Sequence, residues 1–128
     1  MSILNELNNL WRTEKEPKHL YHATWIKHID DISKHGLGKI KELNYKYDDI
    51  NITGNHVYLE QDEDTARGYM ESLVDEGKGT LEDIIVFRVS VDDLDKDKLI
   101  PDPNLDIPNG SVVYKDIIKP EALILIED

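Results

Sequence analysis

The amino-acid sequence predicts a small single domain of the α+β class. Short apolar segments with strand-like composition alternate along the chain with segments whose apolar residues recur at helical spacing. A length of 128 residues suits one hydrophobic core. We therefore expect one domain over residues 1–128, with an N-terminal helix and linker at 1–17 and the core at 18–128, built from about five strands and three helices.

The N-terminal half predicts a helix, a strand and a second helix. Apolar side chains recur at helical spacing over residues 2–12, and a short apolar strand follows at 19–23. Thr24 can cap a helix that stops at Gly36, because glycine is the usual residue after a helix C-terminus. Residues 38–54 are polar and predict a long loop.

The C-terminal half carries most of the strand signals. Its expected elements are a strand at 56–59, a helix from Asp62 through Leu73, a strand at 84–91, a helical turn at 92–99, and strands at 112–114 and 122–126. The strand at 84–91 has the strongest signal, partly continuous and partly alternating, as in a central strand. Ile85, Phe87 and Val89 should then share one buried face.

The charge of the chain is uneven. The formal net charge is −12, and most of the acidic residues follow residue 47, whereas residues 12–47 are mildly basic and hold four of the five histidines. Excess negative charge repels phosphates, which disfavours nucleic acid as a substrate or partner. The acidity either serves solubility alone or forms a face that meets a basic partner or imitates nucleic acid.

Several classes of protein are not expected. The chain has no cysteine, which excludes disulfides, thiolate zinc sites and a cysteine nucleophile. The N-terminus lacks the features of a signal peptide, and no segment approaches the roughly 20 apolar residues that span a bilayer. We therefore expect a cytoplasmic protein without a membrane partner. The histidines are not closely paired with carboxylates, so no metal site is expected.

Three aromatic residues carry the functional prediction. His22 stands near the end of the first strand, Tyr58 lies in the second strand, and Tyr69 follows eleven residues later in the next helix. This order resembles the catalytic half of the ADP-ribosyltransferase fold, a superfamily that includes diphtheria-toxin-like transferases, poly(ADP-ribose) polymerases and RNA 2′-phosphotransferases. The resemblance covers residues 19–126 and implies a small split, antiparallel-rich β-sheet with flanking helices.

The resemblance also implies NAD as the substrate. His22 would hydrogen-bond the adenosine ribose, Ala23 replaces the glycine whose backbone holds the nicotinamide amide, and Thr24 takes the hydroxyl position. Tyr58 and Tyr69 would clamp the nicotinamide ring, each contributing on the order of 1 kcal/mol. The alternative is structural: a histidine that ends a strand, and tyrosines of the core.

The third motif departs from the pattern of the family. The transferases place a glutamate on a later strand, where it supports the transition state as the glycosidic bond breaks. That position falls near Gly110 or Ser111, neither of which is a carboxylate, but Ser111 would still line the cofactor site. Asp116 and Glu121 are the remaining carboxylates, so we expect Glu121 to act beside Tyr58 in catalysis. Solvated surface charge is the alternative for both.

The RNA 2′-phosphotransferase branch also lacks this glutamate, but it depends on arginines that grip a phosphate. None of Arg12, Arg67 and Arg88 lies beside His22 in the sequence, which disfavours that branch. We therefore expect an NAD-binding mono-ADP-ribosyltransferase-like protein that modifies a macromolecular target, with a protein as the expected target. The alternatives are an inactive module of the same fold that binds a nucleotide or a protein, and an acidic inhibitor, of the phage or mobile-element type, of a nucleic-acid-binding protein.

Overall fold

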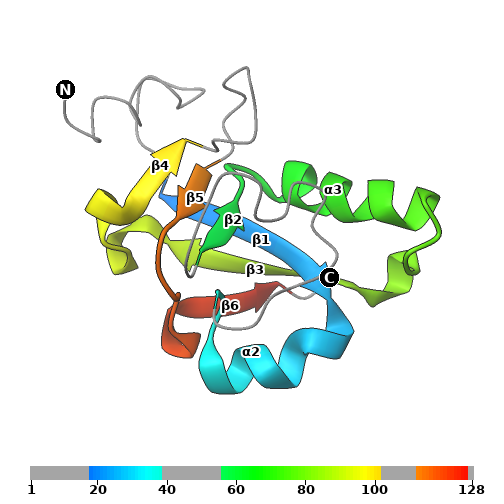
Figure 1. Ribbon diagram of the computed structural model, residues 1–128, viewed down its shortest axis with the longest axis horizontal. Coiled ribbons are helices and arrows are strands. Elements are labelled where there is room, and N and C mark those ends of the chain that lie inside the picture. Colours follow the sequence, from blue (N-terminus) through cyan, green and yellow to red (C-terminus); the bar gives the residue numbers. More distant parts are fainter. Residues whose placement is uncertain (1–17, 39–55, 102–111, 127–128) are drawn as a thin grey trace.

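The computed structural model describes residues 18–38, 56–101 and 112–126 (Figure 1). The described strands are β1 (His19–Trp25), β2 (Val57–Leu59), β3 (Ile84–Ser90), β4 (Leu99–Pro101), β5 (Val112–Tyr114) and β6 (Leu123–Ile126). The described α-helices are α2 (Ile29–His35) and α3 (Glu63–Asp75). Short 3₁₀ turns lie between them: η1 (Ile26–His28), η2 (Leu81–Asp83), η3 (Val91–Asp93), η4 (Lys96–Lys98) and η5 (Pro120–Ala122).

The strands form two small antiparallel sheets. One has the order β1-β3-β6 and the other has the order β2-β5-β4. The predicted α+β class is therefore confirmed, and β3 is the central strand of its sheet as expected. Strand β4 was not predicted. It occupies the end of the segment in which a helical turn was expected, and η3 and η4 supply that turn.

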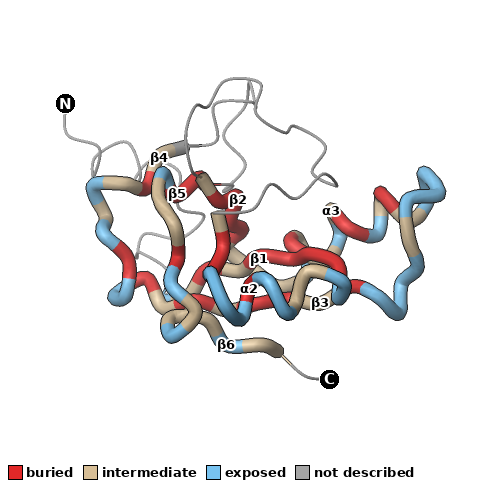
Figure 2. The backbone as a smooth tube through the Cα atoms, turned by 60° about the horizontal axis from the view of Figure 1, so that its bottom comes forward, coloured by how far each residue is buried: buried red, intermediate tan, exposed pale blue. Residues whose placement is uncertain are grey.

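Apolar side chains of β3 pack on both faces of the first sheet. Ile84 and Val86 pack with α3, whereas Phe87 and Val89 enter the main core on the opposite face. Figure 2 shows buried residues along β1 and β2 and exposed residues at the outer turns. Ile85 packs against that same main core but is only partly buried. The prediction that Ile85, Phe87 and Val89 share one face is confirmed, with less burial for Ile85. Burial of both faces explains the nearly continuous apolar run of this strand.

Helix α3 begins and packs as its sequence predicts. The carboxylate of Asp62 accepts a hydrogen bond of 2.7 Å from the backbone N–H of Thr65, which caps the helix. Ala66, Met70 and Leu73 are buried at helical spacing against β1 and β3. Only three residues separate the end of β2 from the first turn of α3.

Helix α2 begins later than expected. Thr24 does not cap a helix, because β1 continues through Trp25 and pairs with Ile84 of β3. A 3₁₀ turn separates the strand from α2. Gly36 ends α2 as predicted, with φ of 79°, and a Cβ at this position would lie 2.0 Å from the carbonyl oxygen of Ile118. Only glycine fits there.

Some expectations fall on other parts of the chain. The helix predicted at 2–12 and residues 39–54 of the predicted loop lie outside the described residues. Within the described ranges, no helix has the length and apolar character needed to cross a membrane.

Candidate functional site

Strands β1 and β2 meet at one point and then separate. Tyr21 and Glu60 exchange two backbone hydrogen bonds, each of 2.8 Å, and this bridge is the link that joins the two sheets here. Beyond the bridge, β1 stays paired with β3, whereas β2 pairs with β5. We call the region from this bridge to Tyr58 and Thr24 the strand divergence. It contains four of the residues that the sequence singled out.

His22 connects the two strands across the divergence. The side chain is 2% exposed, and Nδ1 lies 2.8 Å from the backbone carbonyl oxygen of Tyr58. Because a carbonyl oxygen only accepts, Nδ1 must carry the proton and donate it to this hydrogen bond. In the neutral imidazole Nε2 is then an acceptor, which is the role that a ribose hydroxyl requires of its partner.

The backbone of Ala23 is directed toward the separating strand. Tyr21 turns both its N–H and its C=O toward Glu60, and residues two apart in a strand turn these groups to the same edge. Ala23 therefore faces Val86 of β3 as a non-hydrogen-bonded pair, with its own N–H and C=O on the β2 side. A donor and an acceptor side by side match the two polar groups of a carboxamide.

Thr24 is fully buried, with 0% of its surface exposed. Its hydroxyl oxygen has no hydrogen-bond partner in the described part of the chain. An unsatisfied buried hydroxyl costs roughly 1–3 kcal/mol of stability. The described packing gives the polar side chain no role at this position, where a valine would fill the same volume.

Tyr58 and Tyr69 lie on different elements, as predicted. Tyr58 is 5% exposed, packs on Val113 of β5, and meets the ring of His56 edge-on at a centroid distance of 5.3 Å and an interplanar angle of 89°. Tyr69 is half-buried on α3, one residue before the buried Met70. His22 thus contacts the main chain of Tyr58, while the phenol of Tyr58 lies on the face of β2 that turns away from the main core.

Glu60 is a site residue that sequence reasoning missed. It is 1% exposed and is the one buried carboxylate among the described residues. Side chains alternate along β2, and Val57 and Leu59 enter the main core, so Glu60 leaves the strand on the same face as Tyr58. Its position two residues after Tyr58 was the signal that could have identified it.

Arg88 is a second residue that sequence reasoning did not place near the strand divergence. It pairs with Tyr21 in the β1–β3 ladder, and Tyr21 in turn bridges to Glu60, so the three residues form a row across β3, β1 and β2. No arginine lies beside His22 in the sequence, but in the fold Arg88 lies opposite Tyr21, the residue before His22. Arg88 is half-buried, and its Nε is buried without a hydrogen-bond partner among the described residues. A guanidinium remains charged and suits a phosphate.

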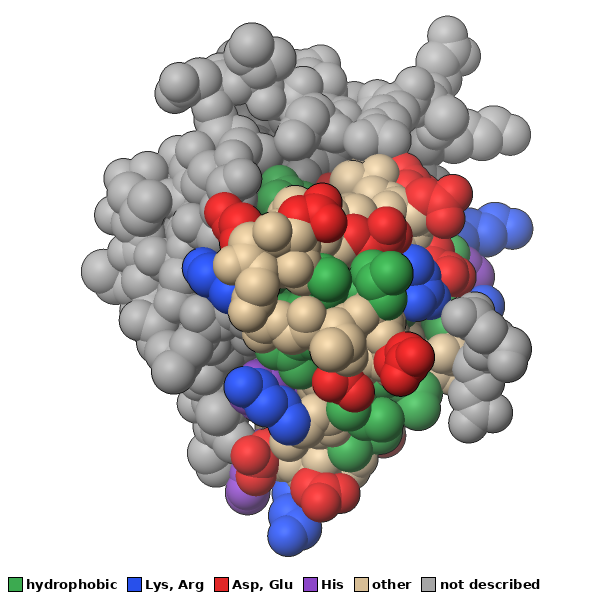
Figure 3. All heavy atoms as spheres, turned by 90° about the vertical axis from the view of Figure 1, so that its right-hand side faces the viewer, with side chains coloured by type: hydrophobic (Ala, Val, Ile, Leu, Met, Phe, Trp, Pro, Cys, Tyr) green, Lys and Arg blue, Asp and Glu red, His purple; other side chains and the backbone are tan. Residues whose placement is uncertain are grey.

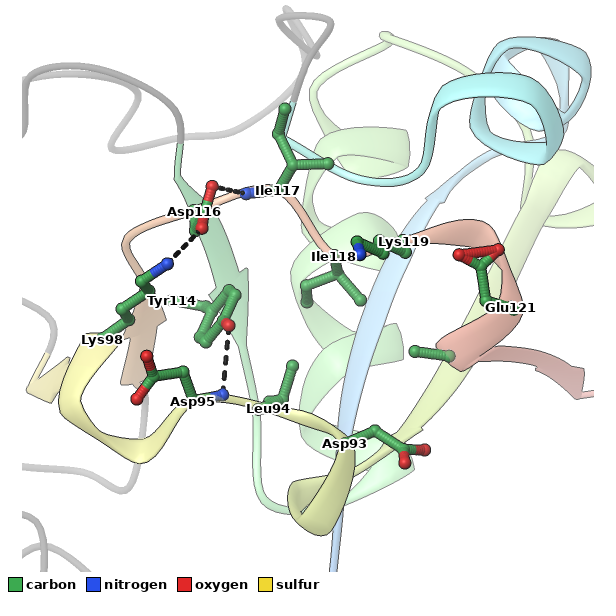
Figure 4. A pocket seen from close by; sticks show the side chains of 11 residues that line it. Asp93, Leu94, Asp95, Lys98, Tyr114, Asp116, Ile117, Ile118, Lys119 and Glu121 are labelled. Carbon is green, nitrogen blue, oxygen red and sulfur yellow. Dashed lines mark hydrogen bonds and ion pairs between the residues drawn. The ribbon is translucent and has the colours of Figure 1, made fainter.

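The two carboxylates that the sequence favoured lie elsewhere. Asp116 and Glu121 line an open pocket of about 490 Å³, together with Asp93, Asp95 and Lys98 (Figure 4). None of His22, Ala23, Thr24, Tyr58 and Tyr69 lines this pocket. Glu121 is exposed on η5, and Ser111 lies outside the described residues.

The charges of this pocket are solvated and partly neutralised. Lys98 Nζ donates to Asp116 Oδ2 at 2.5 Å, with 42% of each side chain exposed. That hydrogen bond, with a second one from the backbone N–H of Ile117, holds the pKa of Asp116 below its usual range. The same contact with Asp116 raises the pKa of Lys98. We call this region the carboxylate pocket.

No protein-family model matches the chain, and no curated protein matches it either. Among the described residues, no group of three or more histidine and carboxylate side chains is placed to hold a metal ion. The geometry of the strand divergence is therefore the basis for a functional proposal.

Proposed function

We propose that this protein binds NAD at the strand divergence and transfers its ADP-ribose moiety to a macromolecular target, in the manner of the mono-ADP-ribosyltransferases that its motifs resemble. One observation carries this proposal. His22, from the first motif, and Tyr58, from the second, are joined by a hydrogen bond of 2.8 Å at the point where the two sheets separate. Residues 36 positions apart in the sequence thus meet at one site.

The groups at the divergence match the parts of NAD. Nε2 of His22 accepts a hydrogen bond from an adenosine ribose hydroxyl, because Nδ1 donates to the carbonyl oxygen of Tyr58. The backbone N–H and C=O of Ala23 receive the carboxamide of nicotinamide, and Thr24 offers a buried hydroxyl. Tyr58 and Tyr69 supply aromatic faces for the cationic nicotinamide ring. Arg88 supplies a positive charge for the diphosphate.

The proposed target is a protein, and the proposed setting is the cytoplasm, in keeping with the absence of cysteine. An excess of acidic residues makes nucleic acid the less favoured target. NAD itself is used as a substrate, so no bound cofactor or metal ion is part of this proposal.

Two variants of His22 test the proposal by titration calorimetry with NAD. In His22→Asn, the amide nitrogen can still donate to the carbonyl of Tyr58, but the acceptor at Nε2 is lost, so we expect at least about tenfold weaker NAD binding with a nearly unchanged fold, which corresponds to about 1.4 kcal/mol. In His22→Ala, the contact with Tyr58 is lost as well, so we expect weaker binding and a lower melting temperature.

His35→Ala is the matched control, because this histidine is exposed at the end of α2. It should bind NAD as the parent does. Wild-type protein that does not bind NAD would contradict the proposal. If the wild type binds, labelled NAD and a host lysate then show whether a labelled macromolecular band forms.

One observation favours a second candidate, the acidic inhibitor or protein-binding module. Between residues 71 and 83, at the C-terminal end of α3 and in the turn before β3, five carboxylates and one lysine are exposed: Glu71, Asp75, Glu76, Glu82 and Asp83, and Lys78. Figure 3 shows many acidic side chains on one side of the molecule, with basic side chains among them. Such a surface attracts a basic partner. This candidate becomes the leading one if the wild type fails to bind NAD.

A further inference from the structure

Glu60 is buried at the strand divergence and belongs to none of the three motifs. A carboxylate is almost never fully buried unless it has a specific role or partner, because removing its charge from water is costly. Glu60 is only 1% exposed, whereas Glu121 is exposed and the side chain of Asp116 is 42% exposed. The buried carboxylate is therefore the one whose charge acts through a low dielectric, where its effect on a nearby cation is largest.

The direction of the Glu60 side chain follows from two independent observations. Alternation along β2 places it on the face of Tyr58, opposite the core residue Leu59. The antiparallel bridge to Tyr21 places it on the face of Tyr21, which packs toward Ala23 and α3. Both observations give the same face of the sheet.

The spacing brings Glu60 within reach of a ligand that contacts this face. Residues two apart in a strand lie about 7 Å apart, so Glu60 is about that far from Tyr58 along β2. The same spacing separates Ala23 from Tyr21, the bridge partner of Glu60. A nicotinamide ring held by the Ala23 backbone beside Tyr58 would have its ribosyl bond within reach of an extended glutamate side chain.

We propose that Glu60 is the catalytic carboxylate of this protein, in place of the glutamate that the third motif lacks at Ser111. This role rests on the proposed function, because it requires NAD at the strand divergence. The carboxylate would stabilise positive charge on the ribosyl carbon as the bond from this carbon to the nicotinamide nitrogen breaks.

The step is balanced as follows. The electron pair of the broken bond goes to the ring nitrogen, so that the pyridinium leaves as neutral nicotinamide. A nucleophilic oxygen or nitrogen of the target, or a water molecule, attacks the ribosyl carbon and forms the new bond. The proton of the nucleophile passes to the carboxylate of Glu60 and from there to solvent, which regenerates the starting carboxylate.

The test separates binding from bond cleavage. NAD affinity is measured by calorimetry, and release of nicotinamide from NAD is measured by chromatography with water as the acceptor. Glu60→Gln keeps the size of the side chain and the backbone bridge but removes the charge. We expect its NAD dissociation constant to stay within about threefold of the parental value while nicotinamide release slows by about 100-fold or more.

Two further variants complete the design. Glu60→Asp keeps the charge but shortens the side chain by one methylene, so we expect an intermediate loss in the rate of nicotinamide release. If Glu60→Gln does not fold, this variant decides whether Glu60 is catalytic. Glu71→Gln is the matched control, because Glu71 is exposed on α3. This variant should release nicotinamide at the parental rate.

Each remaining outcome is decisive. If Glu60→Gln binds NAD and releases nicotinamide at the parental rate, the role of Glu60 is refuted and the proposed function stands. If Glu60→Gln loses affinity and rate in equal proportion, Glu60 only supports the fold of the site and the catalytic role is refuted. If the wild type does not bind NAD, the proposed function fails first and the role of Glu60 fails with it. If the wild type binds NAD but releases no nicotinamide, the catalytic role of Glu60 is refuted while NAD binding stands.

Discussion

The strand divergence and the carboxylate pocket contain similar functional groups in opposite environments. At the divergence, His22, Thr24 and Glu60 are each at most 2% exposed, and His22 is held by a hydrogen bond to the backbone. At the pocket, Asp116 and Lys98 are 42% exposed and neutralise each other. When only residue types and spacing were considered, the carboxylates of the pocket, Asp116 and Glu121, were the candidates for catalysis, and Glu60 was not recognised.

The difference shows that burial, more than residue type, distinguishes these two regions. A carboxylate in water interacts weakly with a cation a few ångströms away, whereas the same group in a protein interior interacts several times more strongly. The fold bears the cost of burying polar groups at the divergence without satisfying the hydroxyl of Thr24 within the described residues. Such a cost is common at functional sites and rare at purely structural ones.

The largest expected effect on stability concerns the packing of Gly36 beside the carboxylate pocket. Gly36 lies against Ile118, which lines the carboxylate pocket, and the neighbouring Leu37 bridges to the same residue. Gly36→Ala combines a strained φ of 79° with a contact of 2.0 Å to a backbone oxygen, so it should lower the free energy of unfolding by roughly 3 kcal/mol or more. Urea denaturation measures this loss.

Gly68→Ala provides the control for this substitution. Gly68 lies inside α3 and has no atom within 4 Å of the position of an added Cβ, so alanine should stabilise the protein by up to about 1 kcal/mol. If Gly36→Ala were as stable as the parent, the close approach of Gly36 to the backbone of Ile118 would not require glycine at this position.

An effect of intermediate size and opposite sign is expected at the divergence. Thr24→Val keeps the shape of the side chain and removes a buried hydroxyl that has no partner in the described ranges, so it should raise the free energy of unfolding by about 1 kcal/mol. The same variant should bind NAD more weakly than the parent under the proposed function. Thr80→Val provides the comparison, because its exposed hydroxyl donates to Asp83 at 3.0 Å and its removal should not stabilise the protein.

If Thr24→Val were less stable than the parent, the expectation for Thr24 would be contradicted. It would show that the hydroxyl is satisfied in solution, and Thr24 would then be a structural residue of β1. Thermal unfolding followed by circular dichroism, with and without NAD, distinguishes these results.

The smallest effect is expected from the ion pair of the carboxylate pocket. The pKa of Asp116 is lower in the folded protein than in the unfolded chain. Its contribution to stability is therefore present above the unfolded-state pKa and disappears as the pH falls through the folded-state pKa. Asp116→Asn should therefore lower the melting temperature slightly at neutral pH, and the difference from the parent should vanish as the pH falls below the lowered pKa of the folded state. The raised pKa of Lys98 makes its own contribution disappear only at strongly basic pH.

Added salt should reduce this small effect further, because both side chains are exposed to solvent. Asp93→Asn, at an exposed position on the same pocket, is the matched control and should not change the melting temperature. A large decrease in the melting temperature of Asp116→Asn would contradict this expectation. It would mean that the ion pair between Lys98 and Asp116 stabilises the fold more strongly than its exposure to solvent indicates.

The sequence by itself determined the elements whose signals are local. The apolar pattern of residues 84–91 identified the central strand, Asp62 marked the start of α3, and Gly36 marked the end of α2. These signals depend on side-chain periodicity and on caps that act within a few residues of the chain, so no tertiary contact is needed to recognise them. The placement of His22 on a strand and of Tyr58 on the next one was also predictable for this reason.

Only the tertiary structure decided which polar residues meet. Thr24 suits a helix cap locally, but the ladder between β1 and β3 extends past it and overrides that preference. Glu60 and Arg88 were not recognised as site residues, because strand register, set by the packing of both sheets on a shared core, brings them to either side of Tyr21. A carboxylate and a guanidinium 28 positions apart thus flank one strand, and their environment depends on burial that no local pattern encodes.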